Sequence, residues 1–104
     1  MCFPTDPPAF VESYLPPQCF LIGTNATYNC SAVSEVVGNP QPSLRANVTQ
    51  SEMDSVELAA DTVITKGSRN YSVNVTCIAD NGIGPVATAS GLMNFGSKYA
   101  CIYL

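Results

Sequence analysis

A chain of 104 residues, of which 46% are apolar and 12% charged, can form one domain with a substantial hydrophobic core. Its net charge is −4, with four basic residues and no His, so it lacks the basic surface that nucleic acids or anionic membranes attract. The absence of His removes the usual acyl-transfer dyads and triads, and no apolar run approaches the roughly 20 residues that cross a bilayer.

The first 18 residues are rich in proline. The prolines are Pro4, Pro7, Pro8, Pro16 and Pro17. Because proline cannot donate a hydrogen bond to a strand ladder, residues 1–18 are expected to form an arm or a broken edge strand. This stretch lacks the basic start and apolar centre of a signal peptide, so we expect a processed chain, a fragment or a domain of a longer protein.

Two segments alternate apolar and polar residues with the period of a half-buried β-strand. In residues 26–32 the even positions are apolar, and in residues 71–79 the odd positions are apolar. Cys30 and Cys77 fall on the two faces that are expected to be buried. Two inward cysteines on two half-buried strands meet the requirement for a disulfide across a sandwich core.

Turn residues separate these strands from shorter β-rich runs. They occur at residues 38–42, 66–68 and 81–85, and the last turn predicts a hairpin into a strand that begins at Val86. Residues 51–61 contain helix formers but end in a β-rich run, so a strand and a connection are expected, with room for one helical turn. Several short strands at this spacing indicate an all-β sandwich or barrel.

Three segments carry a resemblance to a known family. Residues 77–84, Cys-Ile-Ala-Asp-Asn-Gly-Ile-Gly, follow the pattern C-x-A-x-N-x-x-G. Residues 28–32 surround the first of the two core cysteines, and residues 38–44 follow the pattern G-x-P-x-P-x-hydrophobic. Together these segments resemble the immunoglobulin superfamily, in particular its I-set and C2-like members.

The resemblance covers residues 7–93 and implies an all-β fold, a two-sheet antiparallel immunoglobulin-like β-sandwich. It also implies that Cys30 and Cys77 form the disulfide between the sheets. The core Trp of the family falls at Ala46 here, so other side chains must fill that space. Residues 94–104 match nothing in the family and are expected to form a tail beyond the last strand.

Three further cysteines leave the remaining disulfide pairing open. In an immunoglobulin-like topology the A′ strand runs beside the G strand, so Cys19 could meet Cys101, and a Cys2–Cys19 bridge is equally consistent with the sequence. With five cysteines in all, at least one is free or joins another chain. The cysteines are widely spaced and the chain has no His, so neither a metal site nor a cofactor is expected.

N-x-[ST] sequons favour the same oxidising compartment as the disulfides do. The candidate glycosylation sites are Asn25, Asn29, Asn47, Asn70 and Asn74. Two of them, Asn29 and Asn74, are expected on the outward faces of the alternating strands. The sequence therefore predicts a secreted protein or the extracellular side of a cell surface.

These observations favour binding over catalysis. The leading hypothesis is a recognition or adhesion module of a cell-surface or secreted protein, with a protein partner bound through loops or a sheet face. The expected loops are residues 34–42 and the turn that contains Asp80, Asn81 and Ile83. Nucleic acid and direct membrane insertion are not expected, whereas a disulfide-linked or tandem-domain assembly is compatible with the odd cysteine count.

Two alternatives stay open. The domain could be a passive spacer in an ectodomain of several domains, which predicts tandem repeats in the precursor and no loop-dependent partner. It could instead be a small disulfide-rich secreted inhibitor, which predicts a compact framework of four bonded cysteines rather than one bridge through a core.

Overall fold

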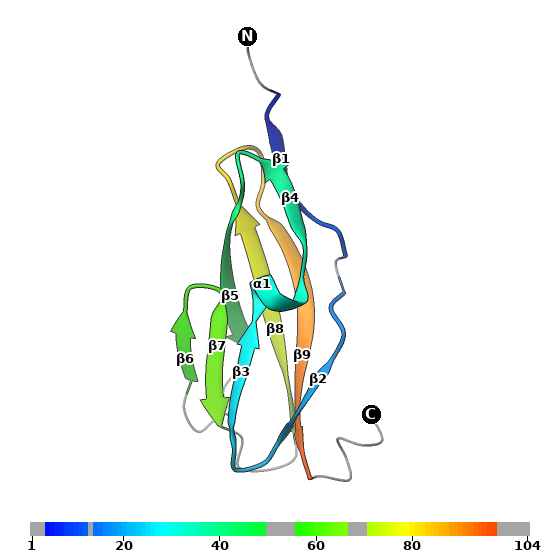
Figure 1. Ribbon diagram of the computed structural model, residues 1–104, viewed down its shortest axis with the longest axis vertical. Helices are drawn as coiled ribbons and strands as arrows, with labels where there is room; N and C mark the ends of the chain where they lie inside the picture. The colour runs from blue at the N-terminus through cyan, green and yellow to red at the C-terminus, as the bar shows by residue number, and fades with distance from the viewer. Residues whose placement is uncertain (1–3, 13, 50–55, 67–70, 98–104) are drawn as a thin grey trace.

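The computed structural model describes residues 4–12, 14–49, 56–66 and 71–97 (Figure 1). They form nine strands and one short helix. In chain order these are β1 Asp6–Phe10, β2 Gln18–Leu21, β3 Asn25–Asn29, α1 Cys30–Val33, β4 Val36–Asn39, β5 Ser43–Thr49, β6 Val56–Ala59, β7 Thr62–Lys66, β8 Tyr71–Asp80 and β9 Ala87–Gly96. None of the helical structure described is long and apolar enough to span a membrane.

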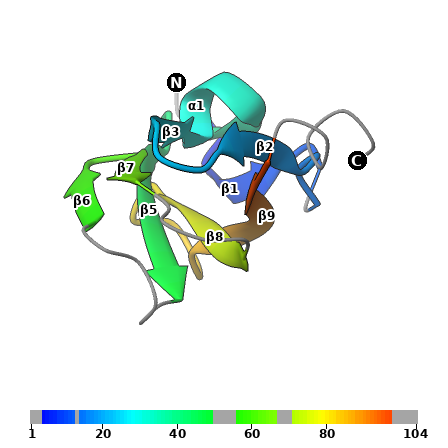
Figure 2. The ribbon, with the colours of Figure 1, turned by 90° about the horizontal axis from the view of Figure 1, so that it is seen from below.

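The strands form a two-layer sandwich with a small ribbon at one end. One layer has the strand order β2-β9-β8-β5 and the other β3-β7-β6, while β1 pairs with β4 (Figures 1 and 2). These pairs are antiparallel except for β2 and β9, which are parallel. The predicted all-β sandwich is confirmed, including a strand of the N-terminal region that runs beside the last strand.

The core lies between the two layers and follows the predicted alternation on β8. Its buried residues there are Val73, Val75, Cys77 and Ala79, whereas Ser72 and Asn74 are exposed. Tyr28 and Met93 are the largest fully buried side chains, and they supply bulk in a chain without Trp. Tyr28 reaches from β3 to β9, where a Cβ built on Gly91 would overlap its hydroxyl oxygen. The Tyr28 side chain thus occupies the space that a side chain at Gly91 would need.

The strand expected over residues 26–32 ends early. β3 stops at Asn29, α1 follows, and Ala32 is exposed instead of buried. The cause is capping: the Asn29 Oδ1 accepts a hydrogen bond from the Ala32 amide at 3.1 Å and one from the Ser31 hydroxyl at 2.6 Å. An asparagine side chain that satisfies a helical turn in this way competes with continuation of the ladder.

The segment expected as a loop at residues 34–42 contains a strand. β4 pairs with β1 through Val36 and Phe10 and through Val37 and Ala9. Sequence periodicity could not reveal this short strand, because the strand depends on a partner far away in the chain.

The last strand extends further than expected. β9 runs to Gly96, so residues 94–96 belong to the sandwich and not to a tail. Phe95 is 3% exposed, and its ring lies 5.8 Å from that of Phe20 on β2. Residues 98–104, most of the turn at 66–68 and the first part of the 51–61 segment lie outside the described residues, while β6 forms in the remainder of that segment.

Candidate functional site

A disulfide joins the two layers, as predicted. The sulfur atoms of Cys30, at the start of α1, and Cys77, on β8, are 2.02 Å apart, and their Cα atoms are 5.9 Å apart. Cys19 also forms a disulfide. Its partner lies outside the described residues, as do Cys2 and Cys101, so the choice between these two cysteines stays a prediction.

The three residues predicted to contact a partner lie at the end of β8, which is Asp80, and in the turn between β8 and β9, which contains Asn81 and Ile83. The Asn81 Nδ2 donates hydrogen bonds to the backbone oxygens of Asp6 at 2.8 Å and Pro40 at 2.9 Å. Its Oδ1 accepts from the amide of Ile83 at 3.0 Å, and the Asp80 carboxylate accepts from the amide two residues further on. Asn81 thereby holds three segments together at this end of the sandwich, so it is a positioning residue.

This end of the sandwich, which we call the loop end and which comprises Asp6, residues 37–42 and residues 80–86, also presents apolar surface. Val37, Pro40, Pro85 and Val86 are exposed there. Gly38 is closely packed in the same region, where an added Cβ would come within 2.9 Å of Pro42 Cγ and 3.1 Å of Asn81 Nδ2. Position 38 therefore has no room for a side chain.

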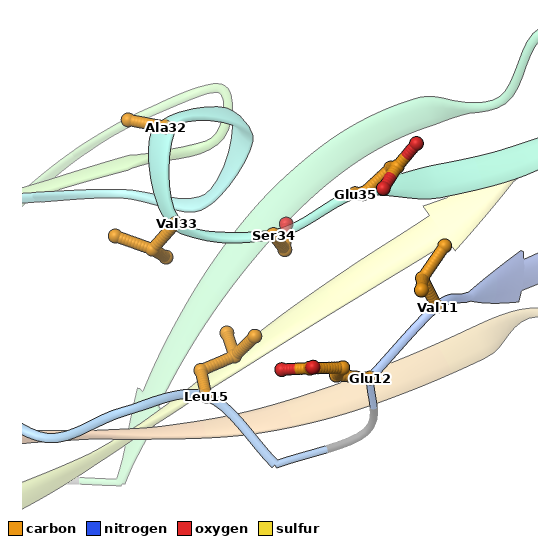
Figure 3. A pocket seen from close by; sticks show the side chains of 7 residues that line it. All are labelled: Val11, Glu12, Leu15, Ala32, Val33, Ser34 and Glu35. Atoms are coloured by element: carbon orange, nitrogen blue, oxygen red, sulfur yellow. The ribbon is translucent and has the colours of Figure 1, made fainter.

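A second feature is a hollow of about 300 Å³ between the segment after β1 and the segment after α1 (Figure 3). We call it the acidic hollow. It is lined by Val11, Glu12, Leu15, Ala32, Val33, Ser34 and Glu35. The Val11 amide donates a hydrogen bond to the backbone oxygen of Glu35 at 2.9 Å, and the Leu15 amide donates to the backbone oxygen of Ser90 at 2.9 Å. These bonds hold the N-terminal segment against β9 and against the connection between α1 and β4.

The acidic hollow combines an apolar floor with an anionic rim. Leu15 is 6% exposed and Val33 is half-buried, while Glu12 and Glu35 are exposed. The Glu12 carboxylate extends toward Leu15 (Figure 3). Within the described part of the chain, neither glutamate forms an ion pair. A side chain with an apolar stem and a cationic head, such as Lys or Arg, has the chemistry that matches this surface.

Sequence reasoning missed the acidic hollow. Its residues come from two segments that are brought together by the β1–β4 pairing and by α1, and both of these elements were unexpected. The only local signal is an acidic residue close to valine in each segment, at Glu12 and Glu35, which is too common to identify a site. Among the described residues, no three His, Cys, Asp or Glu side chains gather as metal ligands.

The predicted glycosylation sites differ in accessibility. Asn25, Asn47 and Asn74 are exposed, and Asn70 lies outside the described residues. Asn29 is half-buried, and its Nδ2 donates a hydrogen bond to the Thr62 hydroxyl at 3.0 Å. Asn29 was expected on the outward face of its strand; its side chain is only partly accessible there, because it caps α1 and contacts β7.

Comparison with known proteins adds structural relatives. No protein-family model matches the chain, and no curated protein matches it. Among solved structures it is similar to the tandem Ig repeats of Dlar, with 20% identity and a TM-score of 0.57 over 89% of this chain and 50% of that one. Dpr11 IG1 bound to DIP-gamma IG+IG2 gives 21% identity and a TM-score of 0.57 over 88% and 48%. The chain is also similar to DIP-gamma IG1+IG2, with 20% identity and a TM-score of 0.56 over 88% of this chain and 49% of that one.

These likenesses establish the fold class. The chain is an immunoglobulin-like β-sandwich domain, as the sequence resemblance implied. It spans about half the length of each solved chain that it matches.

Proposed function

We propose that this domain is an extracellular recognition module of a cell-surface or secreted protein, and that it binds a protein partner through the acidic hollow. The acidic hollow is the observation that carries the proposal, because it offers an apolar floor and two exposed carboxylates, Glu12 and Glu35, on one surface. The partner segment that fits it bears Lys or Arg next to an apolar side chain. The net charge of −4 adds a long-range attraction for such a basic partner.

The fold and the covalent structure support an extracellular setting. The Cys30–Cys77 disulfide crosses the core, and Cys19 is bonded as well. Disulfides persist in oxidising compartments, where exposed sequons can also be used. One of the similar solved structures is a complex between Ig domains, so this fold can bind protein partners. Catalysis is not part of the proposal, because a chain without His lacks the usual acyl-transfer dyads and triads.

A passive spacer is the second candidate. It is favoured by the length comparison, because this chain covers only about half of each solved chain that contains tandem Ig repeats or two Ig domains. A spacer would need rigid ends but no partner for the acidic hollow. The two candidates differ in whether a charge change in the acidic hollow alters any interaction.

The test begins with a binding screen of the secreted, multimerised domain against a panel of extracellular domains. The dissociation constant of each partner is then measured by surface plasmon resonance for the wild type, Glu12→Gln and Asp6→Asn. Both substitutions remove one exposed carboxylate, but Asp6 lies at the loop end and not in the acidic hollow. We expect Glu12→Gln to weaken binding about fivefold, since an exposed charge pair contributes up to about 1 kcal/mol, and Asp6→Asn to leave it unchanged.

The reverse pattern would contradict the proposal. If Asp6→Asn weakens binding and Glu12→Gln does not, the loop end is the binding surface. A domain that binds none of the panel is the result expected of a spacer.

A further inference from the structure

Two of the sequons are paired with each other across neighbouring strands. Asn47-Val48-Thr49 lies on β5 and Asn74-Val75-Thr76 lies on β8. In the antiparallel register Asn47 is opposite Thr76, the two valines are opposite each other, and Thr49 is opposite Asn74. Each asparagine is therefore the register partner of the threonine of the other sequon.

Both asparagines lie on the outward face of this layer. Asn47 and Asn74 are exposed, while their neighbours in sequence Ala46 and Val75 are buried. Diagonal neighbours on adjacent antiparallel strands are about 7–8 Å apart, so the two side chains start close together. In the described part of the chain neither amide nitrogen donates a hydrogen bond, in contrast to that of Asn29.

A second hollow, of about 270 Å³, lies beside Asn74. We call it the Tyr14 hollow. It is lined by Tyr14, Leu15, Pro17, Asn74, Ser90, Gly91 and Leu92. Tyr14 is 83% exposed, and its backbone forms a parallel bridge with Ser90 of β9. Leu92 is opposite Asn74 in the β8–β9 register. A group attached to Asn74 would therefore lie over a tyrosine ring and a leucine.

We propose that Asn47 and Asn74 both carry N-linked glycans, and that the innermost sugars of the Asn74 glycan occupy the Tyr14 hollow. The donor is a lipid-diphosphate-linked oligosaccharide of the secretory pathway. The asparagine nitrogen forms a bond to the anomeric carbon as the bond from that carbon to the phosphate oxygen breaks. The amide loses one proton, and the lipid diphosphate leaves.

The Tyr14 hollow suits a sugar because the sugar and the lining of the hollow each combine apolar and polar surface. Sugar rings have C–H faces that pack on aromatic rings, while their hydroxyls stay in water. Tyr14 likewise combines an apolar ring with a polar tip. With both glycans in place, the outward face of β5 and β8 is covered by carbohydrate. Protein partners are then directed to the acidic hollow or the loop end, although the modification itself does not depend on either surface binding anything.

The first test is glycan mapping by mass spectrometry on protein secreted from eukaryotic cells. Thr49→Ala and Thr76→Ala each destroy one sequon, whereas Thr49→Ser and Thr76→Ser keep it. We expect each alanine variant to lose one glycan and each serine variant to retain both. A folded, secreted wild-type protein that is predominantly unmodified at Asn47 or at Asn74 would overturn the proposal.

The second test measures the accessibility of Tyr14 by hydroxyl-radical footprinting. Asn74→Gln is expected to raise the labelling of Tyr14 several-fold, and the matched variant Asn47→Gln is expected to leave it unchanged. The buried Tyr28 serves as an internal reference for folding. Equal labelling of Tyr14 in the wild type and in Asn74→Gln would show that the glycan does not occupy the Tyr14 hollow and would refute that part.

Discussion

Replacing Tyr28 by phenylalanine should stabilise the domain. The hydroxyl oxygen of Tyr28 is buried and has no hydrogen-bond partner among the described residues. A buried polar group left without a partner costs about 1–3 kcal/mol, whereas phenylalanine keeps the ring and removes that group. Part of this gain is offset because the atoms near Gly91 lose their contacts with the hydroxyl. We therefore expect the free energy of unfolding to rise by about 1 kcal/mol.

The same substitution should change how stability depends on pH. Burial raises the pKa of Tyr28 above its ordinary value of 10.0, so the folded state holds the phenolic proton more tightly than the unfolded state does. The corresponding stability is present below pH 10.0 and is lost as the pH rises from 10.0 through the folded-state pKa. Without Tyr28, this loss disappears.

The assay is urea unfolding of the oxidised protein at neutral pH and at several values above 10.0. The account predicts a higher midpoint for Tyr28→Phe at neutral pH and a difference between the proteins that grows in alkali. Exposed Tyr14 is present in both proteins and cancels in the comparison. A lower midpoint for the variant at neutral pH, with an unchanged slope, would show that the hydroxyl is satisfied and that the reasoning is wrong.

Three further substitutions test the packing, the loop end and the disulfide. Gly91→Ala should lower the free energy of unfolding by about 1–3 kcal/mol, because its Cβ would overlap the Tyr28 hydroxyl; a neutral result in thermal unfolding would contradict this contact. Asn81→Ala should lower the free energy of unfolding by about 1–3 kcal/mol and speed hydrogen exchange at the loop end, because it removes the hydrogen bonds to Asp6 and Pro40. Unchanged hydrogen exchange would argue against the positioning role of Asn81. Replacing both Cys30 and Cys77 by alanine should lower the free energy of unfolding by about 4 kcal/mol, because their disulfide closes a loop with a sequence separation of 47. A variant that is as stable as the wild type in urea would count against the disulfide.

The parts of the fold that could be predicted are those with a local pattern. Residues 71–79 have apolar residues at every odd position and polar residues at the even positions except Ile78, so their strand and the inward position of Cys77 follow from periodicity alone. The extension of β9 was also predictable, because Met93 and Phe95 continue the alternation of the preceding odd positions, but the family resemblance ended at residue 93.

The parts that could not be predicted depend on contacts between distant segments. Asn29 ends its strand because its side chain caps α1 and contacts Thr62, which sequence spacing does not reveal. β4 exists because β1 pairs with it. Asn81 was expected to contact a partner, but its side chain bonds to Asp6 and Pro40 within the domain. The β1–β4 pairing and the capped turn of α1 also bring together the two segments that line the acidic hollow.

The most direct test of the proposed recognition role is zero-length carbodiimide crosslinking between the glycosylated domain and a partner identified in the binding screen. This reagent joins a carboxylate to an amine that touches it. The account predicts crosslinks from Glu12 or Glu35 to a partner lysine, which would place a basic segment in the acidic hollow. A partner that binds tightly but is crosslinked to neither glutamate, with its contacts on the outward face of β5 and β8, would contradict the account.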